Sequence, residues 1–185
     1  GLWVQSQESS LASGANLVVE AGNDILLEGA DLNAEETVLL DAGDDIILES
    51  RESGFELGRL FNFKVAKGSQ IQGSNVVLKA GDDIKSYGAK LNAKETVVLD
   101  AGDDIYLGKS RKGRSKRALF NITSRSTTDI RSGENVVMKA GDDIRGNKHL
   151  IHAKGTVILE AGDDISLYKG RVSAKENLRV DAGDD

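Results

Sequence analysis

The amino-acid sequence predicts an all-β protein: a parallel β-helix, or solenoid, of about seven coils with 21 residues per coil and two inserted arms or hairpins. Three observations predict this fold. A four-residue signature recurs at a fixed period, alternating apolar residues precede each copy, and aromatic residues are scarce. The chain of 185 residues has 21 Gly but only one Trp, three Tyr and four Phe. A narrow solenoid interior suits stacked aliphatic side chains better than rings.

The recurring signature is Ala-Gly-Asp-Asp, with Ala-Gly-Asn-Asp in its first copy. The copies begin at Ala21, Ala42, Ala80, Ala101, Ala140, Ala161 and Ala182. Successive copies are separated by 21, 38, 21, 39, 21 and 21 residues, and Ile follows the first six. Helical repeats need a period of 3.6 residues, and the Leu-x-x-Leu pattern of leucine-rich repeats is absent, so stacked β-coils are the architecture that fits.

Each unit contains three short strands. Apolar residues alternate before the signature, as in Val38 and Leu40, and a second strand follows it, as in Ile46–Leu48. A third apolar position, such as Leu32, completes the coil. Equivalent strands are expected to stack about 4.8 Å apart. In the turn, we expect Gly to supply unusual backbone angles and each Asp carboxylate to cap its own turn.

Two insertions, at residues 49–68 and 108–128, account for the gaps of 38 and 39 residues and add about 17 or 18 residues each. All four Phe residues lie in them: Phe55, Phe61, Phe63 and Phe120. We predict that the arms lie against the β-helix and that their aromatic side chains cover an outward apolar row, which would otherwise be exposed. This row consists of Val18, Leu39, Val77, Val98, Val137 and Ile158. The alternative is that the row or the arms bind a partner.

The composition argues against an enzyme. The chain has no Cys and two His, which excludes disulfides, thiolate zinc sites and a cysteine nucleophile. The Asp pairs resemble glycosidase carboxylates, but an active site occurs once, whereas this pair recurs on every coil. We therefore predict no catalytic residues, no cofactor and no metal site. Two alternatives stay open: a polysaccharide-degrading β-helix enzyme, and opportunistic cation binding to stacked carboxylates that repel by about 1 kcal/mol per pair.

A basic cluster lies in the second insertion and is the strongest candidate for partner binding. Its six cations are Lys109, Arg111, Lys112, Arg114, Lys116 and Arg117. The cluster could hold a sulfated glycan or the phosphates of lipopolysaccharide, or it could simply be a solvated tip. Three aromatic residues of the first insertion, Phe55, Phe61 and Phe63, are further candidates. The net charge of −6 gives no reason to expect nucleic acid as a partner of the whole chain.

The repeat units resemble the haemagglutinin repeats of filamentous-haemagglutinin-type exoproteins. The resemblance rests on Asn-Leu-Val-Val-Glu-Ala-Gly-Asn-Asp-Ile (16–25), Thr-Val-Leu-Leu-Asp-Ala-Gly-Asp-Asp-Ile (37–46) and Leu-Glu-Gly-Ala-Asp-Leu-Asn-Ala (27–34). The insertion 49–68 is similar to those in the second repeat class of contact-dependent growth inhibition exoproteins. The chain departs from the family in carrying two acids in the turn. The resemblance covers essentially the whole chain.

This resemblance implies a right-handed parallel β-helix from a large exoprotein on the surface of a Gram-negative bacterium. Such a protein leaves through an outer-membrane transporter of the two-partner type. It adheres to a target-cell membrane, glycan or protein, or it delivers a C-terminal toxin. We expect residues 1–185 to be one segment of a longer array, since the chain stops inside a repeat unit, directly after the signature that ends at Asp185. No apolar run reaches the length of a membrane span.

Overall fold

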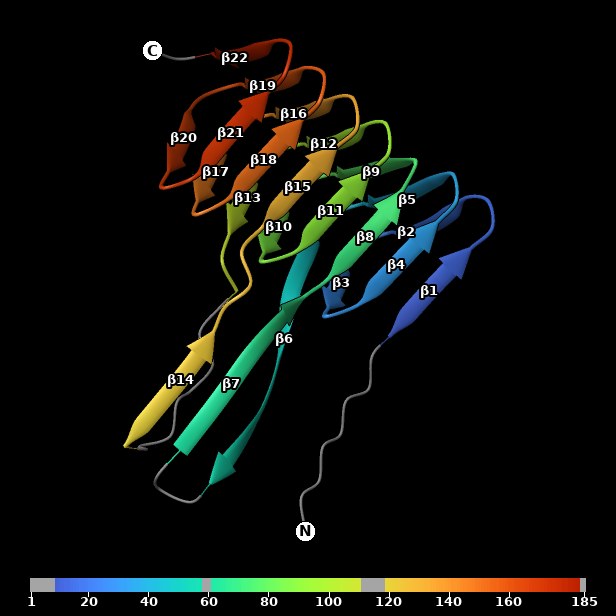
Figure 1. Cartoon of the computed structure of the whole chain (residues 1–185). Coiled ribbons are helices and arrows are strands. Elements are labelled where there is room, and N and C mark those ends of the chain that lie inside the picture. The colour runs from blue at the N-terminus through green and yellow to red at the C-terminus, as the bar shows by residue number, and fades with distance from the viewer. Residues whose placement is uncertain (1–8, 58–60, 111–118, 184–185) are drawn as a thin grey trace.

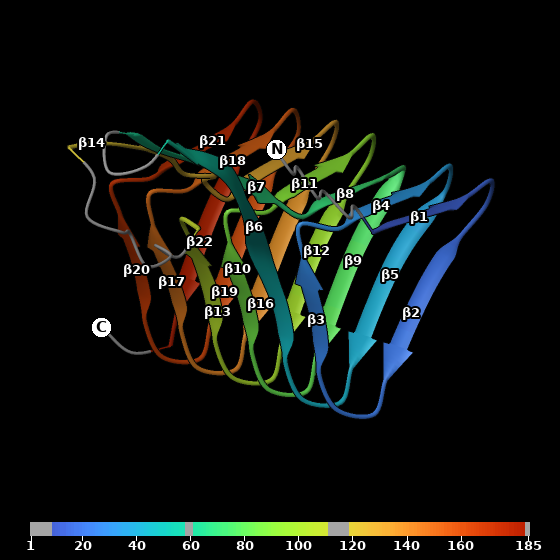
Figure 2. The ribbon, with the colours of Figure 1, turned by 90° about the horizontal axis from the view of Figure 1, so that it is seen from below.

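The computed structural model describes residues 9–57, 61–110 and 119–183. Within them the chain forms only strands, turns and bends, and the strands wind into a parallel β-helix. The first six coils each contribute one strand to each of three sheets, and the last coil contributes to the first two; the sheets form the three sides of the rod in Figures 1 and 2. The all-β fold and the parallel β-helix predicted from the sequence are thereby confirmed.

The three sheets are built from equivalent strands of successive coils. The first sheet contains β1 (Ser10–Ser13), β4 (Asp31–Ala34), β8 (Gln70–Gly73), β11 (Lys90–Ala93), β15 (Asp129–Ser132), β18 (Leu150–Ala153) and β21 (Arg171–Ala174). The second contains β2 (Leu17–Ala21), β5 (Thr37–Ala42), β9 (Asn75–Ala80), β12 (Val97–Ala101), β16 (Val136–Ala140), β19 (Val157–Ala161) and β22 (Leu178–Ala182). The third contains β3 (Ile25–Glu28), β6 (Ile46–Leu57), β10 (Ile84–Tyr87), β13 (Ile105–Gly108), β17 (Ile144–Asn147) and β20 (Ile165–Tyr168).

The register follows the signature. Ala21 pairs with Ala42, Ala42 with Ala80 and so on to Ala161 with Ala182, always in parallel. Equivalent positions of the repeat therefore stack along the rod, and a one-residue slip would turn the apolar side chains outward. We number the coils 1 to 7 from the N-terminus, with β1 and β2 in coil 1 and β21 and β22 in coil 7.

The interior consists of aliphatic rows that run along the rod. The row of Val38, Val76, Val97, Val136 and Val157 is fully buried, as is the neighbouring row of Leu40, Leu78, Leu99, Met138 and Leu159. The third sheet adds Ile46, Ile84, Ile105 and Ile144, which are also fully buried. Each buried aliphatic side chain stabilises the fold by about 1.5–3 kcal/mol before entropic costs. The period-two alternation of each strand supplies this core.

The coils turn at three corners, which we name for what they carry. The first corner joins the first sheet to the second, and the aspartate corner, formed by the signature, joins the second sheet to the third. The arm corner joins the third sheet back to the first. Where the arm corner is tight, it uses a left-handed residue: Gly29, Gly88, Lys148 or Lys169, with φ between 49° and 87°.

Both arms leave at the arm corner. In the first arm, β6 runs on beyond coil 2 and pairs antiparallel with β7 (Phe61–Gly68), from Ser50 opposite Gly68 to Leu57 opposite Phe61. From the second arm, β14 (Phe120–Ser124) pairs in parallel with β7. The hairpin predicted for the first insertion is present. The three strands form a small sheet that projects away from the coils (Figure 1).

The described parts of the arms do not cover the outward apolar row, so that prediction is wrong. The row lies on the second sheet, whereas the arms project from the corner between the other two sheets (Figures 1 and 2). Val18, in coil 1, is 52% exposed, and the middle of the row is half-buried because its side chains stack on one another. β7 instead pairs with β6 and β14.

The two arms insert equal lengths of chain. Leu48 to Gln70 and Leu107 to Asp129 each span 22 positions, whereas the equivalent arm-free stretch from Ser86 to Lys90 spans 4. The arms therefore do not explain why the two long gaps between signatures differ by one. The shorter gap arises because coil 3 lacks one residue at its first corner. Gly73 is three positions before Val76, whereas Ala93 is four positions before Val97.

Candidate functional site

The backbone of the aspartate corner stacks on itself so closely that only glycine fits. The N–H of Gly102 donates to the carbonyl oxygen of Ala80 at 3.1 Å, and the N–H of Asp103 donates to that of Asp82 at 2.9 Å. A Cβ on Gly102 would overlap the carbonyl oxygen of Gly81 in the preceding coil, and the same holds at each later coil. None of these glycines has a positive φ. The expectation of unusual backbone angles was wrong, since close approach is what requires glycine.

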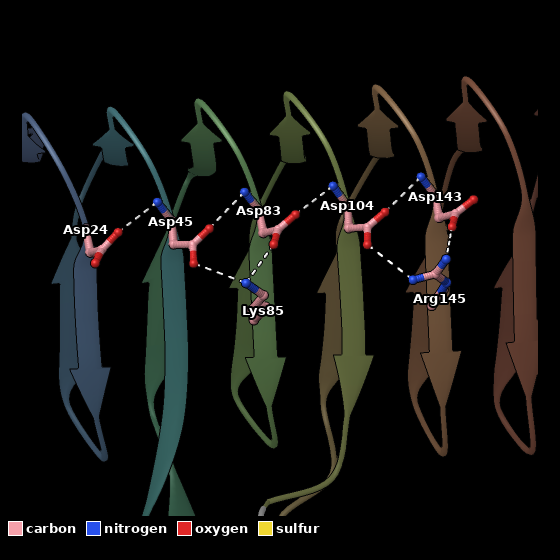
Figure 3. Close-up of polar contacts among 7 residues, drawn as sticks. All are labelled: Asp24, Asp45, Asp83, Lys85, Asp104, Asp143 and Arg145. Atoms are coloured by element: carbon pink, nitrogen blue, oxygen red, sulfur yellow. Dashed lines mark hydrogen bonds and ion pairs between the residues drawn. The ribbon is translucent and has the colours of Figure 1, made fainter.

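The second Asp of each signature links its coil to the next one (Figure 3). The Asp45 backbone N–H donates to Asp24 Oδ1 at 3.1 Å, and this bond recurs from coil to coil at 2.8–3.1 Å. The series runs through Asp24, Asp45, Asp83, Asp104, Asp143 and Asp164. We call it the aspartate ladder. The carboxylate therefore caps the following coil's turn, and the expectation that it caps its own turn was wrong.

Two cations neutralise the ladder in pairs. Lys85 Nζ lies 3.0 Å from Asp45 Oδ2 and 2.6 Å from Asp83 Oδ2. Two coils further along, Arg145 contacts both Asp104 and Asp143 from the same position (Figure 3). Each cation thus joins the carboxylates of two adjacent coils, which offsets the repulsion between stacked charges. Sequence reasoning missed both residues, although each stands two positions after an Asp in alternate coils.

The cation contacts shift the protonation equilibria. The hydrogen bond with Asp83 is the largest cause that raises the pKa of Lys85, against an opposing effect of burial. Burial by itself would raise the pKa of Asp83, but Lys85 and the backbone N–H of Asp104 outweigh it, and the pKa falls below its ordinary value. Both groups therefore stay charged over the whole neutral range.

The first Asp of the signature has a different environment. Asp82, Asp103 and Asp142 are exposed and stack on one another. Loss of hydration and the neighbouring carboxylates, Asp142 first, raise the pKa of Asp103. In coil 1 the position is Asn23, whose Nδ2 donates to Asp44 Oδ2 at 2.9 Å. No group of three or more His, Asp or Glu side chains converges on a common point in the described chain.

The candidate partner-binding residues lie on the arms. Phe63 is half-buried in β7 opposite Phe55 of β6, and Phe61 pairs with Leu57 at the far end of the hairpin. Lys109, at the base of the second arm, pairs with Thr127 and is half-buried. The other five cations of the basic cluster, Arg111, Lys112, Arg114, Lys116 and Arg117, lie outside the described residues.

Buried hydroxyl groups secure the bases of the arms. Ser69 Oγ lies 3.1 Å from the carbonyl oxygens of Leu27 and Glu49, and Thr128 Oγ1 lies 2.8 Å from that of Gly108. Ser69 and Thr128 occupy the same position of the coil, immediately before the strand that follows an arm. The hydroxyls satisfy backbone groups that would be costly to leave unpaired. The arm-free coils instead carry Ala30, Ala89, His149 or Gly170 at this position.

The two histidines differ sharply in environment. His149 is 1% exposed, and neither ring nitrogen has a hydrogen-bond partner. Its ring occupies space left free by Gly146 and Gly170, where a Cβ would overlap it. Burial lowers the pKa of His149. His152 is exposed, and its Nδ1 lies 2.9 Å from Ser173 Oγ in the next coil.

Comparison with known protein families identifies the repeats. One family, described as hemagglutinin repeat, matches residues 3–55 and 63–118, and a second, described as haemagglutinin repeat, matches residues 120–185. No curated protein and no solved structure matches the chain. In the described residues no helix is long and apolar enough to cross a membrane.

The family assignment agrees with the β-helical fold of the chain. Haemagglutinin repeats form β-helices and are structural repeats of filamentous haemagglutinin-like adhesins, which are secreted or cell-surface proteins rather than enzymes. The two matches together cover nearly the whole chain, and the signature of the repeat recurs from coil to coil. The chain belongs to the haemagglutinin repeat family.

Proposed function

We propose that this chain is a stiff segment of a longer surface fibre, which holds a distal adhesive or toxic module away from the cell that produces it. The observation that carries this proposal is the unbroken register of three parallel sheets through successive coils. A solenoid of this kind resists bending because every coil is hydrogen-bonded to both neighbours. The parent protein is a two-partner-secreted exoprotein of a Gram-negative bacterium, exported by its outer-membrane transporter.

The stiffness of the segment can be measured directly, because the chain has no Cys and accepts specific spin labels. Asn33 and Ser173 stand on the same outward row, five coils apart. Labels on Asn33→Cys and Ser173→Cys should give one narrow distance distribution, centred at about 24 Å before the offsets of the labels are added. A broad distribution would contradict a stiff segment.

The spacer role needs a test in its cellular setting. The chain is displayed on a bacterial surface between an anchor and a known receptor-binding module, and attachment to receptor-coated beads is counted. A Gly/Ser linker of equal residue number serves as the control, since it behaves as a flexible coil. We expect the β-helix to support more attachment than the linker when the surface carries long polysaccharide. Equal attachment would count against the spacer role.

A second candidate function is direct engagement of the target-cell surface by the arms. The observation that favours it is the exposure of three apolar residues on the second arm: Leu119 at 76%, Phe120 at 57% and Ile122 at 56%. The basic cluster lies in the same insertion. Apolar residues next to cations suit the interface of an anionic outer membrane.

Two variants separate this candidate from a passive segment. One changes the basic cluster to Ser, and the other changes Phe120 and Ile122 to Ser. Binding to cells and to purified lipopolysaccharide is then compared with the unmodified chain. Loss of binding in both variants supports engagement through the arm, and unchanged binding favours the passive segment. A third variant tests the first arm in the same assay. It lacks residues 50–67, so that Gly68 follows Glu49 and closes a tight turn at the arm corner, as Gly88 does in the arm-free coil.

A further inference from the structure

The outward apolar row of the second sheet lies on a face that the described parts of the arms do not reach (Figures 1 and 2). Coils 1 to 6 each contribute one apolar residue to it, in parallel register, and Arg179 takes the position in coil 7. The middle of the row is only half-buried, by its own neighbours along the stack. A continuous apolar row of this kind favours a partner surface.

A row of charged residues runs beside the apolar row, two positions further along each strand. We call it the charge row, and in coils 1 to 6 it consists of Glu20, Asp41, Lys79, Asp100, Lys139 and Glu160. From coil 2 to coil 6 the sign of the charge alternates with every coil. Lys139 Nζ lies 3.2 Å from Glu160 Oε2. Within the described residues Asp41, Lys79 and Asp100 form no ion pair, so a partner can pair with them.

A second copy of this chain complements the face in one register. Two rods that pack face to face about a two-fold axis parallel to the strands run in opposite directions, and each row then faces the same row of the other copy. With the axis between coils 3 and 4, coil 3 faces coil 4 and coil 2 faces coil 5. Lys79 then faces Asp100 and Asp41 faces Lys139, and the symmetry makes each pair twice. The register thus gives four ion pairs across the interface.

The two ends of the interface carry the remaining acids. Glu20 of coil 1 faces Glu160 of coil 6, which is a pair of like charges. Glu160 is already neutralised within its own rod, because Lys139 and Arg179 lie 3.2 and 3.6 Å from its carboxylate oxygens. The repulsion at the ends is therefore weaker than the attraction at the centre.

Other arrangements lose this complementarity. An axis through coil 4 sets like charges against each other in every pair of the charge row, as in Lys79 with Lys139. An axis between coils 4 and 5 sets Arg179 against Leu39 in the apolar row. A parallel pair of rods sets the charge row against an uncharged row that contains Thr37. The antiparallel register centred between coils 3 and 4 alone matches both rows.

The size of the face predicts the strength of the association. Six coils of five-residue strands give a face of about 29 Å by about 16 Å, or about 900 Å² over the two copies. Interfaces of this size are weak and reversible.

We propose that this chain binds a second copy of itself through the second sheet, with the two rods antiparallel and coils 3 and 4 at the centre. The apolar rows pack on each other, and the charge rows select the register. This inference goes beyond the spacer role, which a single rod fulfils. A chain that stays monomeric would therefore overturn the inference and leave the spacer role intact.

Charge reversal tests the pairing. Sedimentation equilibrium of the purified chain, at concentrations up to about 1 mM, should show monomers in equilibrium with dimers. Lys79→Asp sets like charges against each other at two of the four ion pairs and should weaken dimerisation by at least about tenfold. Asp100→Lys, added to the same chain, restores opposite charges in this register and should restore dimerisation. Lys90→Asp is the matched control, because it makes the same charge change on the first sheet.

Spin labels test the antiparallel orientation, since the chain has no Cys. Lys94 and Lys154 are exposed residues of the first corner, in coils 4 and 6. In dimers of Lys94→Cys the two labels should lie one coil apart along the rod axis. In dimers of Lys154→Cys they should lie five coils apart, or about 24 Å. A parallel pair of rods would give equal distances for the two variants.

Four outcomes would overturn the proposal. These are a monomer at every concentration, undiminished dimerisation of Lys79→Asp, no recovery in the double variant, and equal label distances. Circular dichroism shows whether each variant keeps the β-helix. If Lys79→Asp does not fold, Asp100→Lys alone takes its place, because it sets two lysines against each other in the same register.

Discussion

The aspartate corner and the arm corner stand at the two ends of the strands of the third sheet, yet in the described coils only the arm corner carries insertions. At the aspartate corner, each turn is hydrogen-bonded to both neighbours and its glycine lies against the preceding glycine carbonyl. At the arm corner, a single left-handed residue closes a tight turn, and a whole arm can take its place. The contrast teaches that close stacking between neighbouring coils, rather than the conformation of a single turn, determines which corner can accept inserted residues.

The largest effect is expected at a stacked glycine. Gly102→Ala would force a Cβ into the Gly81 carbonyl and should lower the free energy of unfolding by about 3 kcal/mol or more. Gly22→Ala is the matched control, because the same position in coil 1 has no atom within 4 Å of the added Cβ. Urea denaturation followed by circular dichroism measures both. Equal stability of the two variants would contradict the close-approach argument.

A smaller effect should separate the two Asp residues of one turn. Asp104→Ala leaves the N–H of Asp143 without its acceptor and leaves Arg145 paired with Asp143 alone, which should cost about 2 kcal/mol. Asp103→Ala removes an exposed carboxylate among like charges and should leave the free energy of unfolding nearly unchanged. Asp104→Asn, which retains an acceptor oxygen, should fall between them. If the Asp103 and Asp104 variants lost equal free energy of unfolding, the hydrogen bonds of the aspartate ladder would not stabilise the fold.

The arm corner should show its own sensitivity to pH through His149. Because burial lowers the pKa of His149, the unfolded chain binds the proton more readily than the folded chain does. Stability is therefore complete above pH 6.5 and falls as the pH drops below it, by at most about 1.4 kcal/mol per pH unit from this group.

Denaturant titrations at pH 7.5 and pH 5 measure this fall. In the His149→Ala variant, the free energy of unfolding should fall less between pH 7.5 and pH 5, because the contribution of His149 is gone. The His152→Ala variant, changed at an exposed position, should show the same fall as the unmodified chain. If His149→Ala retained the full pH dependence, the buried imidazole would not be its source.

The smallest effect concerns the left-handed residues of the arm corner. Lys148 has a φ of 56°, a conformation that costs a side-chain-bearing residue about 1–2 kcal/mol. Lys148→Gly should therefore raise the free energy of unfolding by about 0.5 kcal/mol after the larger entropy of glycine in the unfolded chain is counted. Lys154→Gly, an exposed lysine outside the left-handed region, should not stabilise the chain. Thermal melts of both variants show the sign.

The sequence predicted the coil because every coil repeats the same local pattern. The alternation before each signature placed Val38 and Leu40 inside, and both are fully buried. The function of Asp104 was harder to predict, since its partners lie 39 and 41 positions away and become neighbours only through stacking. A turn residue considered alone has no reason to cap anything except its own turn.

The shortened corner of coil 3 and the site of His149 were not predicted, because both depend on how neighbouring coils stack. The gaps of 38 and 39 residues between signatures differ in the sequence, but spacing alone does not show whether an arm or a corner is one residue shorter. The space for His149 depends on Gly146 and Gly170, which stand in different coils. A glycine at Gly146, where the equivalent positions carry Leu48 or Leu107, was the signal that could have located it.

The alternate placing of Lys85 and Arg145 has a consequence for how such an array can grow or shrink by recombination. Each cation forms ion pairs with the ladder Asp of its own coil and with that of the preceding coil, so the coils are paired as 2 with 3 and 4 with 5. Each pair also contains one arm. Gain or loss of two coils keeps every pair complete, whereas a change of one coil separates a carboxylate from its cation. Unequal crossing-over should therefore leave viable descendants that differ in length by two coils together with one arm.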